Sequence, residues 1–270
     1  MYLDHFGFSI KPFDKTPNPA FFYRSPIHKE ALARLQYGSE ERELTVLTGE
    51  IGTGKTLLSR ALIDSLDESF IPILLINPRL SPNQFLRTIA RRLGVEPPSY
   101  FRADLLEEVN GALYGCYEDG KCPVIIIDEA QLIPGKATFD EIRLLTNFQL
   151  DEANLLSLVL IGQPELRKRL KHPSFAAISQ RIGIRYHLGS MGREDTGNYI
   201  SHRLWTAGGD PDLITDEAID VVYRYSRGLP RVINNIASNA LLMGFSKDSS
   251  RIGPDLILDV VEDLDLEPGS

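Results

Sequence analysis

The stretch Val46-Leu-Thr-Gly-Glu-Ile-Gly-Thr-Gly-Lys-Thr56 decides the fold of this chain. An apolar, β-branched run leads into Gly49-x-x-x-x-Gly54-Lys55-Thr56, the pattern of a phosphate-binding loop. Glycines let successive backbone N–H groups point into one concavity at the start of the following helix, which favours an anion. A strand precedes the loop and an apolar-periodic helix follows it, which is the context that a phosphate-binding loop requires. The alternative is a glycine-rich turn without a ligand, which needs no such context.

The residues of the loop predict ATP and Mg²⁺ as cofactors. We expect Lys55 to reach the β- and γ-phosphates and the Thr56 hydroxyl to fill one Mg²⁺ coordination position. The predicted nucleotide-binding residues are Gly49, Glu50, Ile51, Gly52, Thr53, Gly54, Lys55, Thr56 and Leu57.

The composition is that of a globular protein without the charge of a nucleic-acid binder. The chain has 270 residues, of which 43% are hydrophobic, and its net charge is −8. Nucleic acid is therefore an improbable partner on charge grounds. Cys116 and Cys122 have no nearby histidines and receive no role. The N-terminus lacks the pattern of a signal peptide, and the longest apolar runs are much shorter than a bilayer span, so we expect a soluble, cytoplasmic protein.

The order of apolar segments predicts an α/β fold with a doubly wound parallel sheet. Its strands are continuously apolar and alternate with helices, which is typical of strands buried on both faces. The strands are expected at residues 44–48, 72–76, 124–127, 156–161 and 184–187. Helices are expected from residue 28, after the loop, and at 82–93, 104–117 and within 138–149.

Two further segments flank this predicted domain. Residues 1–26 form an aromatic and proline-rich arm that we expect to pack on the core, since so many exposed rings would promote aggregation. After residue 191 the strand pattern stops, and helices at 193–206, 216–226, 230–244 and 255–264 predict a small all-α domain, the lid. The predicted domains are thus 1–26, 27–189 and 190–267.

Two carboxylates follow the third predicted strand, in Val124-Ile-Ile-Ile-Asp128-Glu129. Parallel α/β sheets bind ligands at the carboxyl ends of their strands. Asp128 is expected to hold Mg²⁺ through water, and Glu129 to orient and polarise the attacking water. The alternative is a pair of acids that caps the next helix. Asp-Glu-Ala-Gln131 is a near match to a helicase box, but no second set of helicase motifs follows.

Polar residues end two other strands. Gln163, after the strand 156–161, is placed to touch the γ-phosphate or the lytic water, with an ordinary turn residue before Pro164 as the alternative. Asn77 follows the second strand and could hydrogen-bond Glu129 and hold it inactive, or be an ordinary strand-end residue.

Two arginines are candidates for sensing the γ-phosphate. Arg181 precedes the domain boundary, the position that an arginine finger acting on a neighbouring subunit needs; Arg185 or a surface ion pair is the alternative. Arg231, in Gly228-Leu-Pro-Arg, lies in the first turn of a lid helix, where the helix dipole disfavours a cation unless an anion compensates. The γ-phosphate is a suitable anion.

This combination of motifs resembles the AAA+ ATPases. In more detail, the chain resembles the general secretion pathway protein A family, which includes MSHA-type pilus biogenesis ATPases and putative secretion ATPases of exosortase loci. The resemblance covers residues 1 to about 265 and is carried by the following segments: Phe8-Ser-x-x-Pro12-Phe13, Thr16-Pro-Asn-Pro19, Phe22-Tyr23, His28-Lys-Glu-Ala-Leu32, Leu47 to Thr56, Asp128-Glu-Ala-Gln131, Ile161-Gly-Gln-Pro-Glu-Leu166 and Gln180-Arg-Ile-x-x-Arg-Tyr-His187. Longer members continue into a membrane span and a peptidoglycan-binding domain, so we expect either a short soluble member or a fragment of a longer one.

The resemblance implies an ATPase that assists assembly of a secretion, pilus or polysaccharide-export apparatus. It also implies a nucleotide-dependent, ring-like homo-oligomer and an inner-membrane partner, which would make the protein peripheral at the inner membrane. Transposition ATPases share much of the pattern, so a DNA-associated ATPase of transposition or replication initiation is the alternative. A nucleotide-dependent scaffold without turnover is disfavoured, because Lys55, Asp128, Glu129 and Arg181 are all present.

Overall fold

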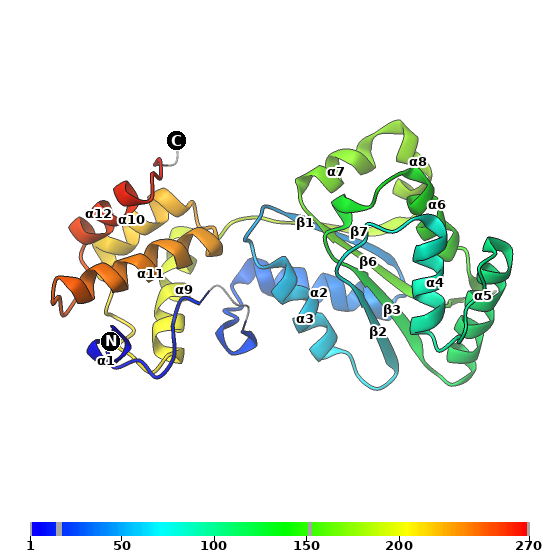
Figure 1. Cartoon of the computed structure of the whole chain (residues 1–270), viewed down its shortest axis with the longest axis horizontal. Coiled ribbons are helices and arrows are strands. Elements are labelled where there is room, and N and C mark those ends of the chain that lie inside the picture. The colour runs from blue at the N-terminus through cyan, green and yellow to red at the C-terminus, as the bar shows by residue number, and fades with distance from the viewer. Residues whose placement is uncertain (1, 15–17, 151–152, 269–270) are drawn as a thin grey trace. The chain divides into compact units, whose positions relative to one another are not determined.

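A five-stranded parallel sheet forms the α/β part of the protein. The computed structural model describes residues 2–14, 18–150 and 153–268. The strands are β1 (Leu44–Gly49), β2 (Phe70–Leu75), β3 (Cys122–Ile127), β6 (Ser157–Gly162) and β7 (Ile182–Leu188), in the order β2-β3-β6-β1-β7 (Figure 1). Every neighbouring pair is parallel. The carboxyl ends of the strands therefore lie at one edge, which is where β1 leads into the phosphate-binding loop.

The three inner strands are buried on both faces. Every residue of β1, β3 and β6 is buried, whereas the edge strand β7 is buried only at its two ends and alternates between exposed and half-buried positions in between. This agrees with the continuously apolar sequence of the inner strands, because helices must cover both faces of such a sheet. The predicted doubly wound parallel sheet is confirmed. Its helices are α2 (Pro26–Glu40), α3 (Lys55–Ser65), α4 (Pro82–Arg92), α5 (Arg102–Glu118), α6 (Lys136–Leu145), α7 (Pro164–Lys171) and α8 (Ala176–Ser179).

Several short elements were absent from the sequence prediction. Helix α7 buries only Leu166 and Leu170, one turn apart, among charged residues, so its apolar pattern is too short to detect. The other unpredicted elements are the helix α1 (Tyr2–His5), α8, the two-residue strands β4 (Gln149–Leu150) and β5 (Ala153–Asn154), and the 3₁₀ turns Pro19–Phe21, Ala130–Leu132 and Pro173–Phe175.

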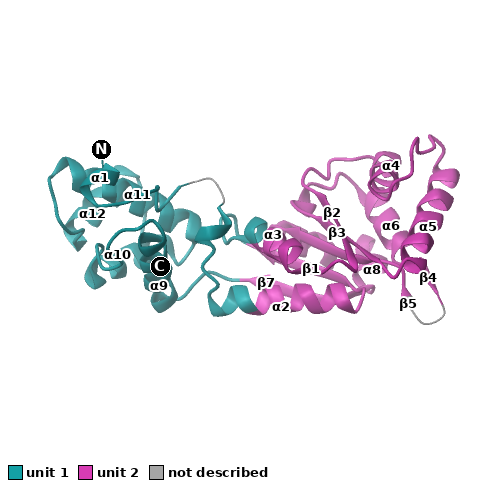
Figure 2. Cartoon of the chain, turned by 90° about the horizontal axis from the view of Figure 1, so that it is seen from below, with its two compact units in different colours: residues 1–29, 50–57, 189–270 teal, residues 30–49, 58–188 magenta. Residues whose placement is uncertain are grey.

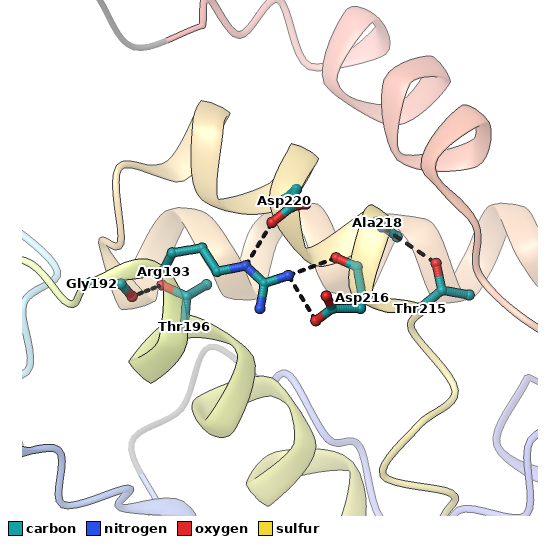
Figure 3. Close-up of polar contacts among 7 residues, drawn as sticks. All are labelled: Gly192, Arg193, Thr196, Thr215, Asp216, Ala218 and Asp220. Carbon is teal, nitrogen blue, oxygen red and sulfur yellow. Dashed lines mark hydrogen bonds and ion pairs between the residues drawn. The ribbon is translucent and has the colours of Figure 1, made fainter.

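Four helices form the all-α part: α9 (Arg193–Thr206), α10 (Asp216–Ser226), α11 (Pro230–Ser246) and α12 (Pro254–Asp263). The Thr215 hydroxyl accepts a hydrogen bond from the backbone N–H of Ala218 and so caps α10. Arg193 joins α9 to α10: its Nε lies 2.6 Å from the Asp220 carboxylate and its Nη2 lies 2.7 Å from that of Asp216 (Figure 3).

The aromatic arm contributes to the core of these four helices. Phe8, Phe13 and Phe21 are buried in the same hydrophobic cluster as α9 to α12, where the sequence predicted only that the arm packs on the core. The backbone N–H of Ser9 donates to the Ala207 carbonyl, and a side chain on Gly209 would lie 2.2 Å from the Phe8 ring. Thr16 and Pro17 of the predicted arm motif lie outside the described residues.

Contacts divide the chain into two compact units (Figure 2). The first takes in residues 1–29, 50–57 and 189–270; the second takes in residues 30–49 and 58–188. The phosphate-binding loop thus belongs to the unit of the arm and the all-α helices, although β1 belongs to the other unit. The division of the chain into domains 1–26, 27–189 and 190–267 stays a prediction.

No described helix has both the length and the apolar composition that crossing a bilayer requires.

Candidate nucleotide-binding site

The loop between β1 and α3 is wound around one carbonyl oxygen. Gly52 and Gly54 have φ values of 85° and 97°, a region that favours glycine. The Glu50 carbonyl accepts hydrogen bonds from the Thr53 N–H at 3.3 Å, the Thr53 hydroxyl at 2.9 Å and the Lys55 ammonium at 2.8 Å. Lys55 is consequently drawn back over the loop and is buried. This is the curled conformation that the glycine pattern predicts.

The first turn of α11 contacts the tip of this loop. The backbone N–H of Arg231 donates to the Gly52 carbonyl at an N···O distance of 3.3 Å. A side chain on Gly52 would lie 2.4 Å from the Arg231 Cβ, so only glycine permits this approach. Gly228, with φ 71°, starts the turn and could not carry a side chain either, since its Cβ would lie 1.9 Å from the Met191 carbonyl oxygen. The structure therefore brings the first turn of α11, with Arg231, to the loop; the expected contact of Arg231 with the γ-phosphate stays a prediction.

A second contact on the loop comes from His28, which sequence reasoning did not assign. Its Nε2 lies 2.9 Å from the Thr53 carbonyl oxygen, and its Nδ1 lies 2.6 Å from the Ser25 hydroxyl. Burial lowers the pKa of the His28 imidazole. The available signal was the motif His28-Lys-Glu-Ala-Leu32, whose position before the loop carries no geometric information by itself.

Asp128 and Glu129 follow β3 at the carboxyl edge of the sheet. The backbone N–H of Asp128 donates to the Leu75 carbonyl at 2.9 Å, which extends the pairing of β3 with β2, and its side chain is buried. Glu129 has φ 54°, a left-handed conformation that a residue with a side chain seldom adopts. Its N–H donates to the Asp128 Oδ1 at 2.8 Å.

Two glutamine amides hold the Glu129 carboxylate. Gln131 and Gln163 both donate from Nε2 to the same oxygen, Oε2, with Gln163 at 3.1 Å. The N–H of Gln163 donates in turn to the Gln131 Oε1 at 3.0 Å. A side chain on Gly162 would lie 2.8 Å from that Oε1, so the glycine admits the amide. The residues after β3 and β6 thus form one hydrogen-bonded cluster, which we call the Glu129 cluster: Glu129, Gln131 and Gln163.

Gln163 was expected at the γ-phosphate or the lytic water; the structure brings it to Glu129. Gln131 was not predicted as a site residue, although Asp-Glu-Ala-Gln drew attention to it. Asn77 does not reach the cluster: its Oδ1 accepts from the Arg79 N–H at 3.4 Å, and among the described residues no hydrogen bond joins it to Glu129. The contact expected of Asn77 is made by the two glutamines instead.

Arg181 lies at the amino end of β7 and is exposed. Its Nη2 donates to the Asn147 Oδ1 at 2.7 Å. Arg185, the alternative finger, is engaged within its own segment, because its Nη2 donates to the Ser179 carbonyl at 2.6 Å and to the Ser179 hydroxyl at 2.8 Å. Ile182 pairs with Leu44 at the start of β1, so Arg181 and the phosphate-binding loop lie beyond opposite ends of that strand.

The oxygen donors suit the predicted cofactors. Mg²⁺ prefers hydroxyl, carboxylate and water oxygens, and it is usually bound through one or two carboxylates together with substrate phosphates. Thr56, in the first turn of α3, and the buried Asp128 provide a hydroxyl and a carboxylate. The N-terminus of α3, with the loop's backbone, suits a polyphosphate.

The comparisons with known proteins agree with this architecture. A family model described as an AAA domain matches residues 38–170. Over 255 residues the chain is 38% identical to general secretion pathway protein A of Aeromonas hydrophila, and the match covers 93% of this chain. The chain is an AAA-domain protein related to general secretion pathway protein A. It spans 46% of the length of that relative, so the match concerns only part of the larger protein.

Solved structures of two other proteins share the fold of this chain. ORC2 of Aeropyrum pernix, solved in complexes with ADPNP and ADP, superposes with a TM-score of 0.65 over 96% of this chain and 72% of its own, at 17% identity. The RuvB branch migration motor of Thermotoga maritima superposes with a TM-score of 0.58 over 88% of this chain and 68% of its own, at 19% identity. At these identities the likeness concerns the fold alone.

Proposed function

We propose that this AAA-domain protein binds and hydrolyses ATP in a Mg²⁺-dependent reaction. The observation that carries the proposal is the Glu129 cluster at the carboxyl edge of the same sheet from which β1 enters the phosphate-binding loop. A loop that binds phosphates and a carboxylate oriented by two amides are the two components that phosphoryl transfer to water requires.

Each residue of the loop has a role in binding. Backbone N–H groups of the loop, other than that of Thr53, cradle the phosphates, and Lys55 exchanges its bond to the Glu50 carbonyl for phosphate oxygens. Thr56 and Asp128 would hold the Mg²⁺ ion. When bound, the ion offsets the negative charge of the phosphates. The guanidinium of Arg231, which extends from a helix turn in contact with the loop, binds the γ-phosphate.

Glu129 orients and polarises the attacking water, and the two glutamines hold its carboxylate in position for this task. Both amides donate to one carboxylate oxygen, which fixes the plane of the carboxylate. The other oxygen then accepts from the water. We assign Gln163 two roles: it positions Glu129, and its amide contacts the γ-phosphate or the lytic water.

Arg181 acts on the nucleotide of a neighbouring subunit. Strand β1 has six residues and spans roughly 17 Å at about 3.3 Å per residue, which is longer than an arginine side chain. Arg181, beyond the amino end of this strand, is therefore too far from the loop that follows its carboxyl end within one chain. In a nucleotide-dependent, ring-like homo-oligomer, Arg181 instead reaches the nucleotide in the loop of a second copy of the chain.

The cellular role that we propose is assembly of a cell-envelope apparatus for secretion, pilus formation or polysaccharide export. The support is the relative named general secretion pathway protein A, of which this chain spans 46%. The protein would work in the cytoplasm, peripheral at the inner membrane, with an inner-membrane protein as its partner.

One observation favours a DNA-associated ATPase as the second candidate. Although the chain carries a net charge of −8, residues 79–102 contain five arginines and one acid, Glu96. Tyr100 and Phe101 in the same segment are each 75% exposed. Arginines with exposed rings suit a nucleic-acid strand. An ATP-dependent anisotropy change with duplex DNA at about 150 mM salt, lost in Arg91→Ala/Arg92→Ala, would favour this candidate over envelope assembly.

Two substitutions test the proposed ATPase. Lys55→Ala should abolish nucleotide binding, because it removes the cation that meets the β- and γ-phosphates. Glu129→Gln should bind ATP as the wild type does and fail to hydrolyse it, because an amide is no base. Wild-type phosphate release by Glu129→Gln in a steady-state assay would show that the base has been assigned wrongly.

A further inference from the structure

His28 is enclosed between the segment that precedes α2 and the phosphate-binding loop. Its side chain is 4% exposed. Both ring nitrogens have partners, the Thr53 carbonyl for Nε2 and the Ser25 hydroxyl for Nδ1. The rings of His28 and Phe22 pack edge to face, with centroids 5.8 Å apart and planes at 88°. The imidazole is therefore fixed in position and in orientation.

These partners determine which nitrogen carries the proton. A carbonyl oxygen can only accept, so Nε2 must be the protonated nitrogen and must donate to Thr53. Nδ1 of a neutral ring then accepts from the Ser25 hydroxyl. Burial, which lowers the pKa of this imidazole, agrees with a neutral ring. His28 is thus a directed donor towards one atom of the loop.

The atom that receives this bond belongs to a peptide unit of the phosphate-binding concavity. The Thr53 carbonyl and the Gly54 N–H share one trans peptide plane and point in opposite directions. A donor that holds the carbonyl outward therefore holds the Gly54 N–H inward. The ring also lies against Gly54, because a side chain there would be 3.1 Å from Nε2. Because Thr53 is buried, its carbonyl without a donor would cost free energy.

We propose that His28 is a positioning residue of the nucleotide site: its Nε2–H fixes the Thr53–Gly54 peptide so that the Gly54 N–H faces the phosphates. The inference rests on the proposed function, since it assumes that phosphates occupy the concavity. It adds a residue outside the loop, contributed by the first turn of α2, to the determinants of nucleotide affinity. The backbone N–H of Arg231 holds the carbonyl of the preceding peptide, that of Gly52.

Two amide substitutions separate positioning from mere space filling. His28→Gln places a donor where Nε2 lies, whereas His28→Asn places its amide where Nδ1 lies, too short to reach Thr53. We expect His28→Gln to bind ATP and ADP within about threefold of the wild type, and His28→Asn to bind both about tenfold more weakly, the effect of one lost hydrogen bond of about 1.4 kcal/mol. The rate at saturating ATP should be unchanged in both variants, because the bond does not touch the water or Glu129.

The experiment is calorimetric titration of the full chain with ADP and ATP, with thermal melting as the check on folding and Lys55→Ala as the reference. Equal affinities of folded His28→Asn and His28→Gln would overturn the inference, and so would a folded His28→Gln that binds tenfold more weakly than the wild type. The comparison of His28→Gln with the wild type tests the inference even where His28→Asn does not fold. If the wild type binds as poorly as Lys55→Ala, the proposed function itself fails; if only Lys55→Ala is impaired, the His28 inference alone fails.

Discussion

Gly52→Ala should impair nucleotide binding although the phosphate-binding pattern leaves position 52 unrestricted. In the structure Gly52 has φ 85°, and its Cβ would lie 2.4 Å from the Arg231 Cβ. Carbon atoms prefer separations of about 3.5–4.0 Å, so the loop and α11 would have to separate by roughly 1 Å. That movement would break the hydrogen bond from the Arg231 N–H to the Gly52 carbonyl.

The magnitude follows from two contributions. An alanine in the left-handed region costs about 1–2 kcal/mol, and the lost backbone hydrogen bond costs about 1 kcal/mol. The sum of roughly 2–3 kcal/mol corresponds to about 30- to 150-fold weaker ATP binding, at about 1.4 kcal/mol per factor of ten. Part of the strain can appear as lower stability instead, so affinity and thermal unfolding must be measured on the same preparation.

The assay is titration with ATP by calorimetry, next to a melting curve. Gly192→Ala is the matched control, since it lies in the same compact unit, has φ −72° and has no atom within 4 Å of the added Cβ. We expect Gly192→Ala to behave as the wild type. A folded Gly52→Ala variant that binds ATP within about threefold of the wild type would refute the account of how α11 meets the loop.

The remaining predictions concern stability. Arg203→Met should destabilise the protein by roughly 2–4 kcal/mol, because Arg203 is buried, donates to the Pro12 carbonyl at 2.6 Å and lies over the Phe21 ring at 4.8 Å. Urea unfolding measures this, with the exposed Arg251→Met as a control; a loss below about 0.5 kcal/mol would contradict it. Stability should also fall below about pH 6.5, where unfolded histidines take up protons. Burial lowers the pKa of His28 and His202, so the folded state resists protonation of these two side chains. Their contribution to stability is therefore complete above about pH 6.5 and declines as the pH falls towards the pKa of the folded state. The urea midpoint should therefore drop between pH 7.5 and 5.5, and the drop should be smaller in His28→Gln; an equal drop in both proteins would show that His28 contributes nothing.

The sequence predicted those parts of the fold whose information is local. The inner strands are continuously apolar and follow or precede recognisable loops, so their positions were predicted to within two residues. Helices α10 and α11 begin at the predicted residues 216 and 230, because a cap such as Thr215 or a first-turn proline such as Pro230 acts on neighbouring residues only. The packing of the aromatic arm with α9 to α12 depends on contacts between residues about 200 positions apart, such as Ser9 with Ala207, and no local pattern encodes them.

The same distinction applies to the site. The order of the motifs predicted which residues belong to the loop and the acidic strand end. It did not predict that Gln131 and Gln163 share the Glu129 carboxylate, because this requires the left-handed turn at Glu129 and the space above Gly162. Asn77 was an equally good candidate from its sequence position. Only the geometry separates these amides.

The most direct test of the account is to mix Arg181→Ala with Lys55→Ala and measure phosphate release. Arg181 and the phosphate-binding loop lie beyond opposite ends of β1, so we expect the active site to be completed by a second subunit. Each variant alone should be inactive, but in a mixed oligomer the intact loop of the first meets the intact arginine of the second. The account predicts that activity partly returns on mixing. If the mixture stays as inactive as its components while sedimentation shows mixed oligomers, action of Arg181 in trans is contradicted and Arg185 becomes the next candidate.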